Sequence, residues 1–78
     1  MRTRKQVAEI LNNINNRNDI EVKNDGGYWF VRIGGYESGG CYSLKDLVAE
    51  IVNKETIQLT YNRWTMQGMK TMDIKGIK

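Results

Sequence analysis

Two stretches of this chain space their aliphatic residues three and four positions apart, and no other pattern in the sequence constrains the fold as much. Residues at positions i, i+3, i+4 and i+7 lie on one side of an α-helix, so each stretch predicts a helix with one apolar face. The eight residues are Val7, Ile10, Leu11 and Ile14 in the first stretch, and Leu44, Leu47, Val48 and Ile51 in the second. At about 1.5–3 kcal/mol for each buried side chain, they supply most of the hydrophobic stabilisation.

Capping residues predict where both helices begin and end. Thr3 followed by Gln6 forms a capping box at the start of the first helix. That helix is expected to end within the polar run 15–18, because asparagine tolerates the left-handed conformation that terminates helices. Ser43 caps the second helix, which we expect to end near Asn53.

Alternating apolar and polar residues predict strands outside the helices. The first two strands are expected at 20–23 and 28–33, joined by the turn sequence Asn-Asp-Gly-Gly at 24–27. A third strand is expected at 57–61. The order α-β-β-α-β-(β) then describes a small α+β fold, in which one antiparallel sheet carries both helices on the same face.

The C-terminal part of the chain allows two interpretations. Trp64 and Met66 resume the alternation after a turn at residues 62–63, which indicates a fourth strand. Residues 67–78 fit a helix or a strand. With 78 residues there is room for a single domain spanning residues 1–78.

The two halves of the chain also align with each other. The aliphatic residues of each helix and of the first strand after it match at a constant offset of 37 positions, within the segments 3–33 and 43–74. This offset raises the hypothesis of an internal α-β-β repeat. Any two helix–strand pairs of similar length would align in the same way, so both explanations stay open.

Composition excludes most kinds of catalytic site. The chain has no histidine and one cysteine, Cys41, so histidine-based nucleophiles, imidazole proton shuttles, zinc sites and an internal disulfide are unavailable. We therefore expect no enzyme activity, no catalytic residue, no metal and no cofactor. Since the sequence shows no secretory segment and no apolar run of about eighteen residues, we expect a cytoplasmic protein without a membrane partner.

The most distinctive segment for function is 26–43, which holds six of the eight glycines and five of the seven aromatic residues. Strand alternation places Trp29, Val31 and Ile33 under the helices. It leaves Tyr28, Phe30 and Arg32 on the open face of the sheet, where two rings beside a guanidinium could bind a partner. Whether the last strand of the tail or a second copy of the chain covers these three residues stays open.

A glycine-rich link at 34–40 follows this strand. It is expected to be a mobile surface loop, or a contact loop that becomes ordered on binding, with Tyr36, Glu37 and Tyr42 as contact residues. Arg63, at the expected C-terminal turn, is a further candidate contact. The link leads to a helix N-terminus, but it lacks the lysine and hydroxyl residue that a nucleotide-binding loop requires.

Part of the second strand resembles a signature of RNA-recognition-motif domains. Gly27, Tyr28, Phe30 and Val31 match four positions of the third-strand motif [KR]-G-[FY]-[GA]-F-V-x-[FY], whereas three neighbouring positions differ from it. The residues that differ are Gly26, Trp29 and Ile33. The resemblance implies that Tyr28 and Phe30 would stack on the bases of a nucleic acid.

Charge favours a protein over a nucleic acid as the partner. Residues 19–55 carry seven acidic side chains against four basic ones, and they include the aromatic segment. The termini hold the candidate contacts for phosphate or other anions: Arg2, Arg4, Lys5, Lys70 and Lys75. A nucleic-acid module of this size would carry a denser basic face.

The sequence therefore predicts a non-catalytic protein-binding module. Its size and composition are typical of the small accessory proteins of phages and mobile elements that inhibit or modulate a larger host complex, such as a defence nuclease. The alternative is a domain that binds single-stranded RNA or DNA with the aromatic sheet face. A homodimer is compatible with both hypotheses.

Overall fold

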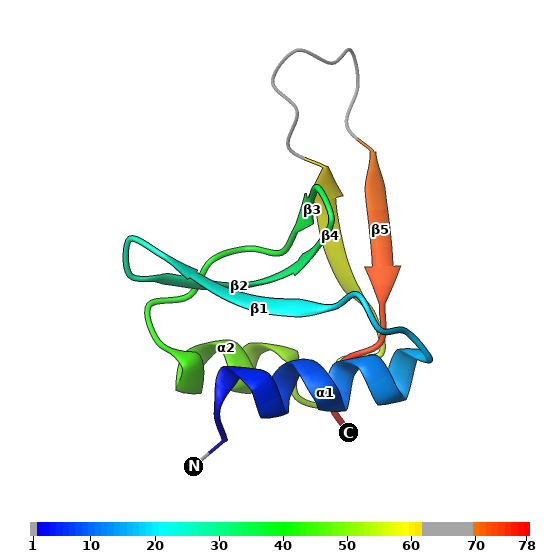
Figure 1. Ribbon diagram of the computed structural model, residues 1–78, viewed down its shortest axis with the longest axis horizontal. Coiled ribbons are helices and arrows are strands. Elements are labelled where there is room, and N and C mark those ends of the chain that lie inside the picture. The colour runs from blue at the N-terminus through cyan, green and yellow to red at the C-terminus, as the bar shows by residue number, and fades with distance from the viewer. Residues whose placement is uncertain (1, 62–69) are drawn as a thin grey trace.

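The structure is a computed structural model, and it describes residues 2–61 and 70–78 (Figure 1). Its elements are α1 (Arg4–Asn15), β1 (Glu21–Asp25), β2 (Tyr28–Ile33), β3 (Tyr36–Glu37), α2 (Leu44–Ile51), β4 (Ile57–Tyr61) and β5 (Thr71–Ile74). The strands form one antiparallel sheet in the order β1-β2-β3-β4-β5, and both helices lie on the same side of it. The expected α+β fold is confirmed, with one strand more than the sequence predicted.

Both helices begin and end as their capping residues predict. The Thr3 hydroxyl accepts a hydrogen bond from the Gln6 backbone at 3.2 Å, and the Gln6 side chain accepts one from the Thr3 backbone at 2.8 Å. Asn16 ends α1 in the left-handed region, with φ of 54°. Ser43 caps α2 by accepting from the Asp46 backbone at 3.0 Å, and Asn53 follows that helix with φ of 60°.

The first hairpin also forms at its predicted turn. Gly26 and Gly27 join β1 to β2 with φ values of 60° and 91°, which L-amino acids rarely adopt. The Asn24 side chain accepts a hydrogen bond from the Gly27 backbone at 3.2 Å. This turn sets the register in which Val22 lies opposite Val31, and both side chains are buried.

The glycine-rich link contains a strand, so the prediction of a loop over 34–40 was wrong in part. Gly34 and Gly35 make a second tight turn, after which Tyr36 and Glu37 form β3 between β2 and β4. A two-residue strand is too short to show an alternating pattern, and it forms because both of its neighbours in the sheet supply hydrogen-bonding partners. Two residues of the link therefore form the central strand of the sheet.

One apolar core lies between the sheet and the helices. Its buried members are Val7, Leu11, Ile20, Val22, Val31, Ile33, Leu47, Ile51, Ile57, Leu59, Ile74 and Ile77. Trp29 packs against this cluster, as the alternation predicted. Each helix contributes only two of its four aliphatic residues as fully buried side chains, and the other two are half-buried.

The C-terminal segment adopts strand structure at β5 and then packs beside α2. Ile77 donates a backbone hydrogen bond to the Ile51 carbonyl at 3.1 Å, and Gly76 donates one to the Lys54 carbonyl at 2.9 Å. A Cβ on Gly76 would overlap the Ile51 carbonyl oxygen, so glycine is required at this close approach. The expected turn at 62–63, with Trp64 and Met66 after it, lies outside the described residues.

The proposed internal repeat remains a prediction, and two observations bear on it. The two left-handed residues, Asn16 and Asn53, lie 37 positions apart, as the alignment requires. The burial of the helices does not follow the same offset, because Val7 is fully buried whereas its counterpart Leu44 is half-buried.

Within the described residues, no helix is long and apolar enough to cross a membrane.

Candidate functional site

The sheet face that points away from the helices is polar, apart from two aromatic side chains. The strand register places these residues on it: Glu21, Lys23, Asp25, Tyr28, Phe30, Arg32, Glu37, Gln58, Thr60, Thr71 and Asp73. Four are acidic (Glu21, Asp25, Glu37 and Asp73) and two are basic (Lys23 and Arg32). This face therefore has an excess of negative charge among the described residues.

The three residues expected on this face are found there. Tyr28 is 49 % exposed, Phe30 is half-buried and Arg32 is exposed. The Arg32 side chain is turned back onto its own hairpin, because its Nε donates a hydrogen bond to the Gly34 carbonyl at 2.8 Å. The last described strand, β5, pairs with β4 at the edge of the sheet and does not cover Tyr28 or Phe30.

Tyr42 joins Tyr28 in an exposed ring pair, which we call the tyrosine pair. The ring centroids are 5.4 Å apart and the planes are tilted by 42°, while Tyr42 is 79 % exposed. The backbone holds the pair in place, since Trp29 and Cys41 exchange hydrogen bonds of 2.7 and 2.8 Å between their N–H and carbonyl groups. Both rings are thus fixed next to each other although most of the Tyr42 surface contacts solvent.

Tyr36 does not lie in a mobile loop, contrary to expectation. It pairs with Ile33 and Tyr61 in the sheet, so its side chain shares the face that packs against the core. Its ring lies 4.9 Å from that of Tyr61, and the Tyr61 ring also covers Gly35 so closely that a Cβ there would overlap it. The Tyr36 side chain is therefore half-buried, and it packs against the core.

The other predicted contacts are dispersed over the molecule. Glu37 lies directly across from Arg32 on the open face. Arg4 and Lys5 line a hollow between α1 and β1, whereas Arg2 lies at a different cleft beside α2. Lys70 immediately precedes β5, whose start lies at the end of the sheet farthest from the helices (Figure 1). These basic residues therefore do not converge on one patch, and Arg63 lies outside the described residues.

Lys75 follows the far end of β5, beside the C-terminal end of α1. Its backbone exchanges hydrogen bonds with the Asn15 side chain. This position separates it from Lys70 by the length of the strand (Figure 1). The two lysines that were predicted together as anion contacts are thus found at opposite ends of β5.

Cys41 does not have the environment of an activated nucleophile. Burial, followed by the charges of Glu50 and Asp46, raises the pKa of its thiol. Reactive thiols have a lowered pKa, because the thiolate is the attacking species. Among the described residues, no cluster of three histidine, cysteine or carboxylate side chains could hold a metal ion.

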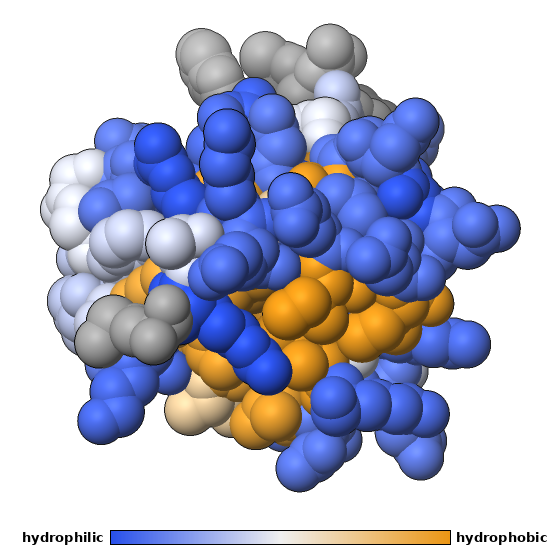
Figure 2. Space-filling view, turned by 60° about the horizontal axis from the view of Figure 1, so that its bottom comes forward, coloured by the Kyte–Doolittle hydropathy of each residue, from blue (hydrophilic) through white to orange (hydrophobic). Residues whose placement is uncertain are grey.

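The helical side of the molecule carries an apolar cleft that the sequence did not indicate as a site. We call it the helix cleft; it has a volume of about 370 Å³ and is lined by Arg2, Leu44, Lys45 and Val48. Figure 2 shows the apolar side chains gathered across this face and surrounded by polar residues. One feature of the sequence could have indicated this cleft: each helix carries four aliphatic residues, which is more than a small core can bury fully.

No protein-family model, curated protein or solved structure matches this chain.

Proposed function

We propose that this chain is a non-catalytic protein-binding module whose contact surface is centred on the tyrosine pair. The observation that carries the proposal is the exposure of two adjacent rings, 49 % for Tyr28 and 79 % for Tyr42, on a rigid backbone. Tyrosine is among the residues that contribute most to protein–protein binding energy, because a large apolar ring is combined with a hydroxyl group.

The backbone around the tyrosine pair reduces the entropy cost of binding. Residues 29 and 41 are linked by two hydrogen bonds, and Ser38 adds two more to Val31, one from each of their backbone N–H groups. A contact surface that is already ordered loses less conformational entropy when a partner binds. Phe30 extends the aromatic surface along β2.

Charge supports a protein partner over a nucleic acid. The open sheet face carries the four acidic and two basic side chains named above, and phosphate groups would be repelled by the excess of carboxylates. Single-stranded nucleic acids are bound by aromatic residues set in a basic groove. The basic side chains in the described parts of this chain lie instead on several separate surfaces.

The more specific form of the proposal is an inhibitor or modulator of a larger host complex, such as a defence nuclease. A small domain with a rigid aromatic surface and an unactivated thiol suits a role in which binding alone has the effect. A direct capture experiment would identify the complex.

The test compares tagged variants in lysate from the native host, with and without added nuclease. The wild-type chain is expected to recover a defined protein complex that nuclease treatment does not remove. The Tyr28→Ala, Tyr42→Ala double variant should lose it, because both rings are removed, whereas the Tyr28→Phe, Tyr42→Phe control keeps the rings and should retain it.

Two results would contradict the proposal. Binding to single-stranded oligonucleotides that weakens steeply with salt would assign the aromatic face to a nucleic acid. Recovery of the same complex by the double alanine variant would show that the tyrosine pair is not the contact surface. Thermal unfolding followed by circular dichroism checks that each variant is folded.

A further inference from the structure

The helix cleft lies within a stripe of incompletely buried aliphatic side chains between α1 and α2. Leu44 and Val48 pack against the core but remain half-buried, and Val52 is 37 % exposed. Ala8 and Asn12 of α1 line the hollow toward β1, and Ile10, on the other flank of α1, is half-buried against the core. Figure 2 shows that apolar side chains gather on the helical face of the molecule.

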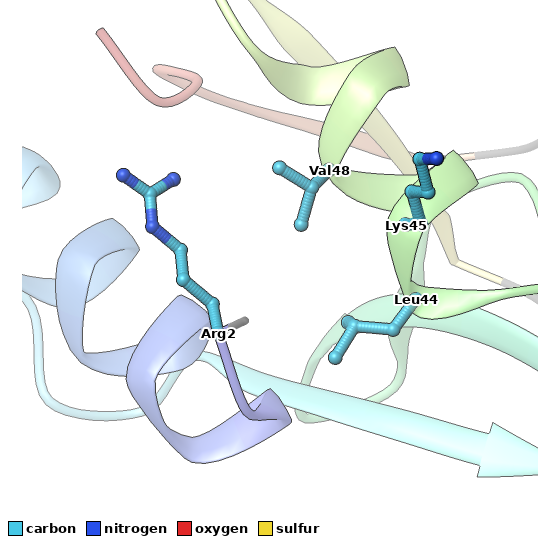
Figure 3. Close-up of a pocket in the computed structure, with 4 residues that line it drawn as sticks. All are labelled: Arg2, Leu44, Lys45 and Val48. Carbon is cyan, nitrogen blue, oxygen red and sulfur yellow. The ribbon is translucent and has the colours of Figure 1, made fainter.

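Two cations border the cleft. Arg2 extends from the N-terminal end of α1 along one side, and Leu44 and Val48 point toward it from α2 (Figure 3). Lys45 lies on the other side of the two aliphatic residues (Figure 3). The described lining is thus an apolar floor with a positive charge at each side and no acidic residue.

The acidic residues of the same helices face other surfaces. Glu50 lines a hollow on the opposite side of α2, together with Cys41. Asp46 acts on the same thiol, since its charge also raises the pKa of Cys41. Glu9 lies in the hollow between α1 and β1. The three carboxylates thus lie away from Arg2 and Lys45, although Arg4 and Lys5 share the hollow of Glu9 between α1 and β1.

We propose that the helix cleft binds an amphipathic helix of another protein, one whose apolar residues are flanked by aspartate or glutamate. Apolar anchors at i, i+3, i+4 and i+7 would lie along the stripe between α1 and α2, as helices do in hydrophobic grooves. Carboxylates on either side of those anchors would meet Arg2 and Lys45. This site is on the opposite side of the sheet from the tyrosine pair and does not depend on it.

The geometry disfavours two other occupants. A second copy of the chain, related by a twofold axis, would bring the positive rim of the cleft against itself, because such an interface joins the same patch on both subunits. A small anionic amphiphile is normally buried over about 70–90 % of its surface. The helix cleft is open to solvent, so it suits a longer, partly exposed ligand.

The test uses synthetic peptides and the full chain. A fluorescein-labelled peptide of about 18 residues would carry leucine at helical anchor positions and glutamate beside them. One control peptide replaces every glutamate with lysine, and another keeps the composition but scatters the leucines. Fluorescence anisotropy measures the dissociation constant of each peptide.

The acidic amphipathic peptide is expected to bind at least about ten-fold more tightly than its lysine counterpart, and the scattered peptide should not bind. Lys45→Glu should weaken the acidic peptide by about five-fold, and adding Arg2→Glu should reverse the preference. The matched control Lys23→Glu makes the same charge change on the open sheet face and should leave the affinity unchanged. Tyr28→Ala with Tyr42→Ala should also leave it unchanged, which separates this site from the proposed function.

Several outcomes would overturn the proposal. Equal affinity for the acidic and basic peptides would show that Arg2 and Lys45 do not select an acidic partner. If neither peptide binds, the helix cleft is not a site for an amphipathic helix. Displacement of the peptide by decanoate would assign the cleft to small anionic amphiphiles. Concentration-dependent dimerisation that Lys45→Glu abolishes would assign it to a second copy of the chain.

Discussion

The side chain of Asn15 pairs with the backbone of Lys75 in both directions. Its Nδ2 donates to the Lys75 carbonyl at 2.9 Å, and its Oδ1 accepts from the Lys75 N–H at 2.7 Å. Asn12 does the same with Ile20, at 3.1 and 2.9 Å. Helix α1 is therefore joined by two amide side chains to the segment before β1 and to the segment after β5.

Replacing Asn15 with alanine should lower the free energy of unfolding by about 0.5–1.5 kcal/mol for each hydrogen bond lost, because the two bonds to the Lys75 backbone and the one to the Leu11 carbonyl disappear. Urea unfolding measures the change. Asn13→Ala is the matched control, since Asn13 lies on the same helix and its side chain makes no hydrogen bond within the described part of the chain. A similar loss in both variants would show that the pairing with Lys75 contributes nothing.

Gly35→Ala should destabilise the fold by about 1–3 kcal/mol, since the added Cβ would overlap the Tyr61 ring. The backbone at Gly35 is not in the left-handed region, so the cost comes from the ring. Gly39→Ala meets no atom within 4 Å and serves as the control. In a Tyr61→Ala background, the cost of Gly35→Ala should largely disappear, and an unchanged cost would point to the backbone instead.

The tyrosine pair should contribute a coupling energy of about 0.5–1.5 kcal/mol to stability, as tilted aromatic pairs do. A double-mutant cycle with Tyr28→Ala and Tyr42→Ala measures it by urea unfolding. Additive single effects would indicate that the rings do not interact in solution.

The Cys41 thiol should titrate at a higher pH in the folded chain than in the unfolded chain, because burial and then Glu50 and Asp46 raise its pKa. The rate of alkylation by iodoacetamide against pH, with and without urea, gives both midpoints. As pH rises past about 8.5, the unfolded chain loses its thiol proton first, so the free energy of unfolding should fall.

Glu50→Gln tests the electrostatic part of this effect. Removing the carboxylate charge should lower the folded midpoint while leaving the unfolded one unchanged. A folded midpoint at or below the unfolded one would contradict the environment described for Cys41.

The local features of the fold could be predicted from the sequence. Thr3 and Ser43 cap helices, and Gly26 with Gly27 makes a tight turn, because each of these depends on residues only a few positions away. Burial on β2 followed from alternation within a single strand. These features require no knowledge of what packs against them.

The features that depend on distant segments could not be predicted. Strand β3 forms only because β2 and β4 flank it, and Tyr36 is half-buried because Tyr61 lies beside it. The pairing of Asn15 with Lys75 joins positions 60 residues apart. The helix cleft depends on how α1 and α2 are placed on the sheet, which the periodicity of either helix leaves open.

Strand β3 has a consequence for how the chain reaches its native state. Hairpin β1–β2 is built from near neighbours in sequence, whereas β3 must join it to β4, whose paired residues lie some 24 positions farther along (Tyr36 with Tyr61, Glu37 with Thr60). Pairings between distant segments form later in folding than local ones. Until β3 is in place, β2 and β4 each present an unpaired edge, and such edges accept strands from other chains. We therefore expect misfolding to occur mainly by exchange of β3 between two molecules. Refolding at high protein concentration should favour this exchange.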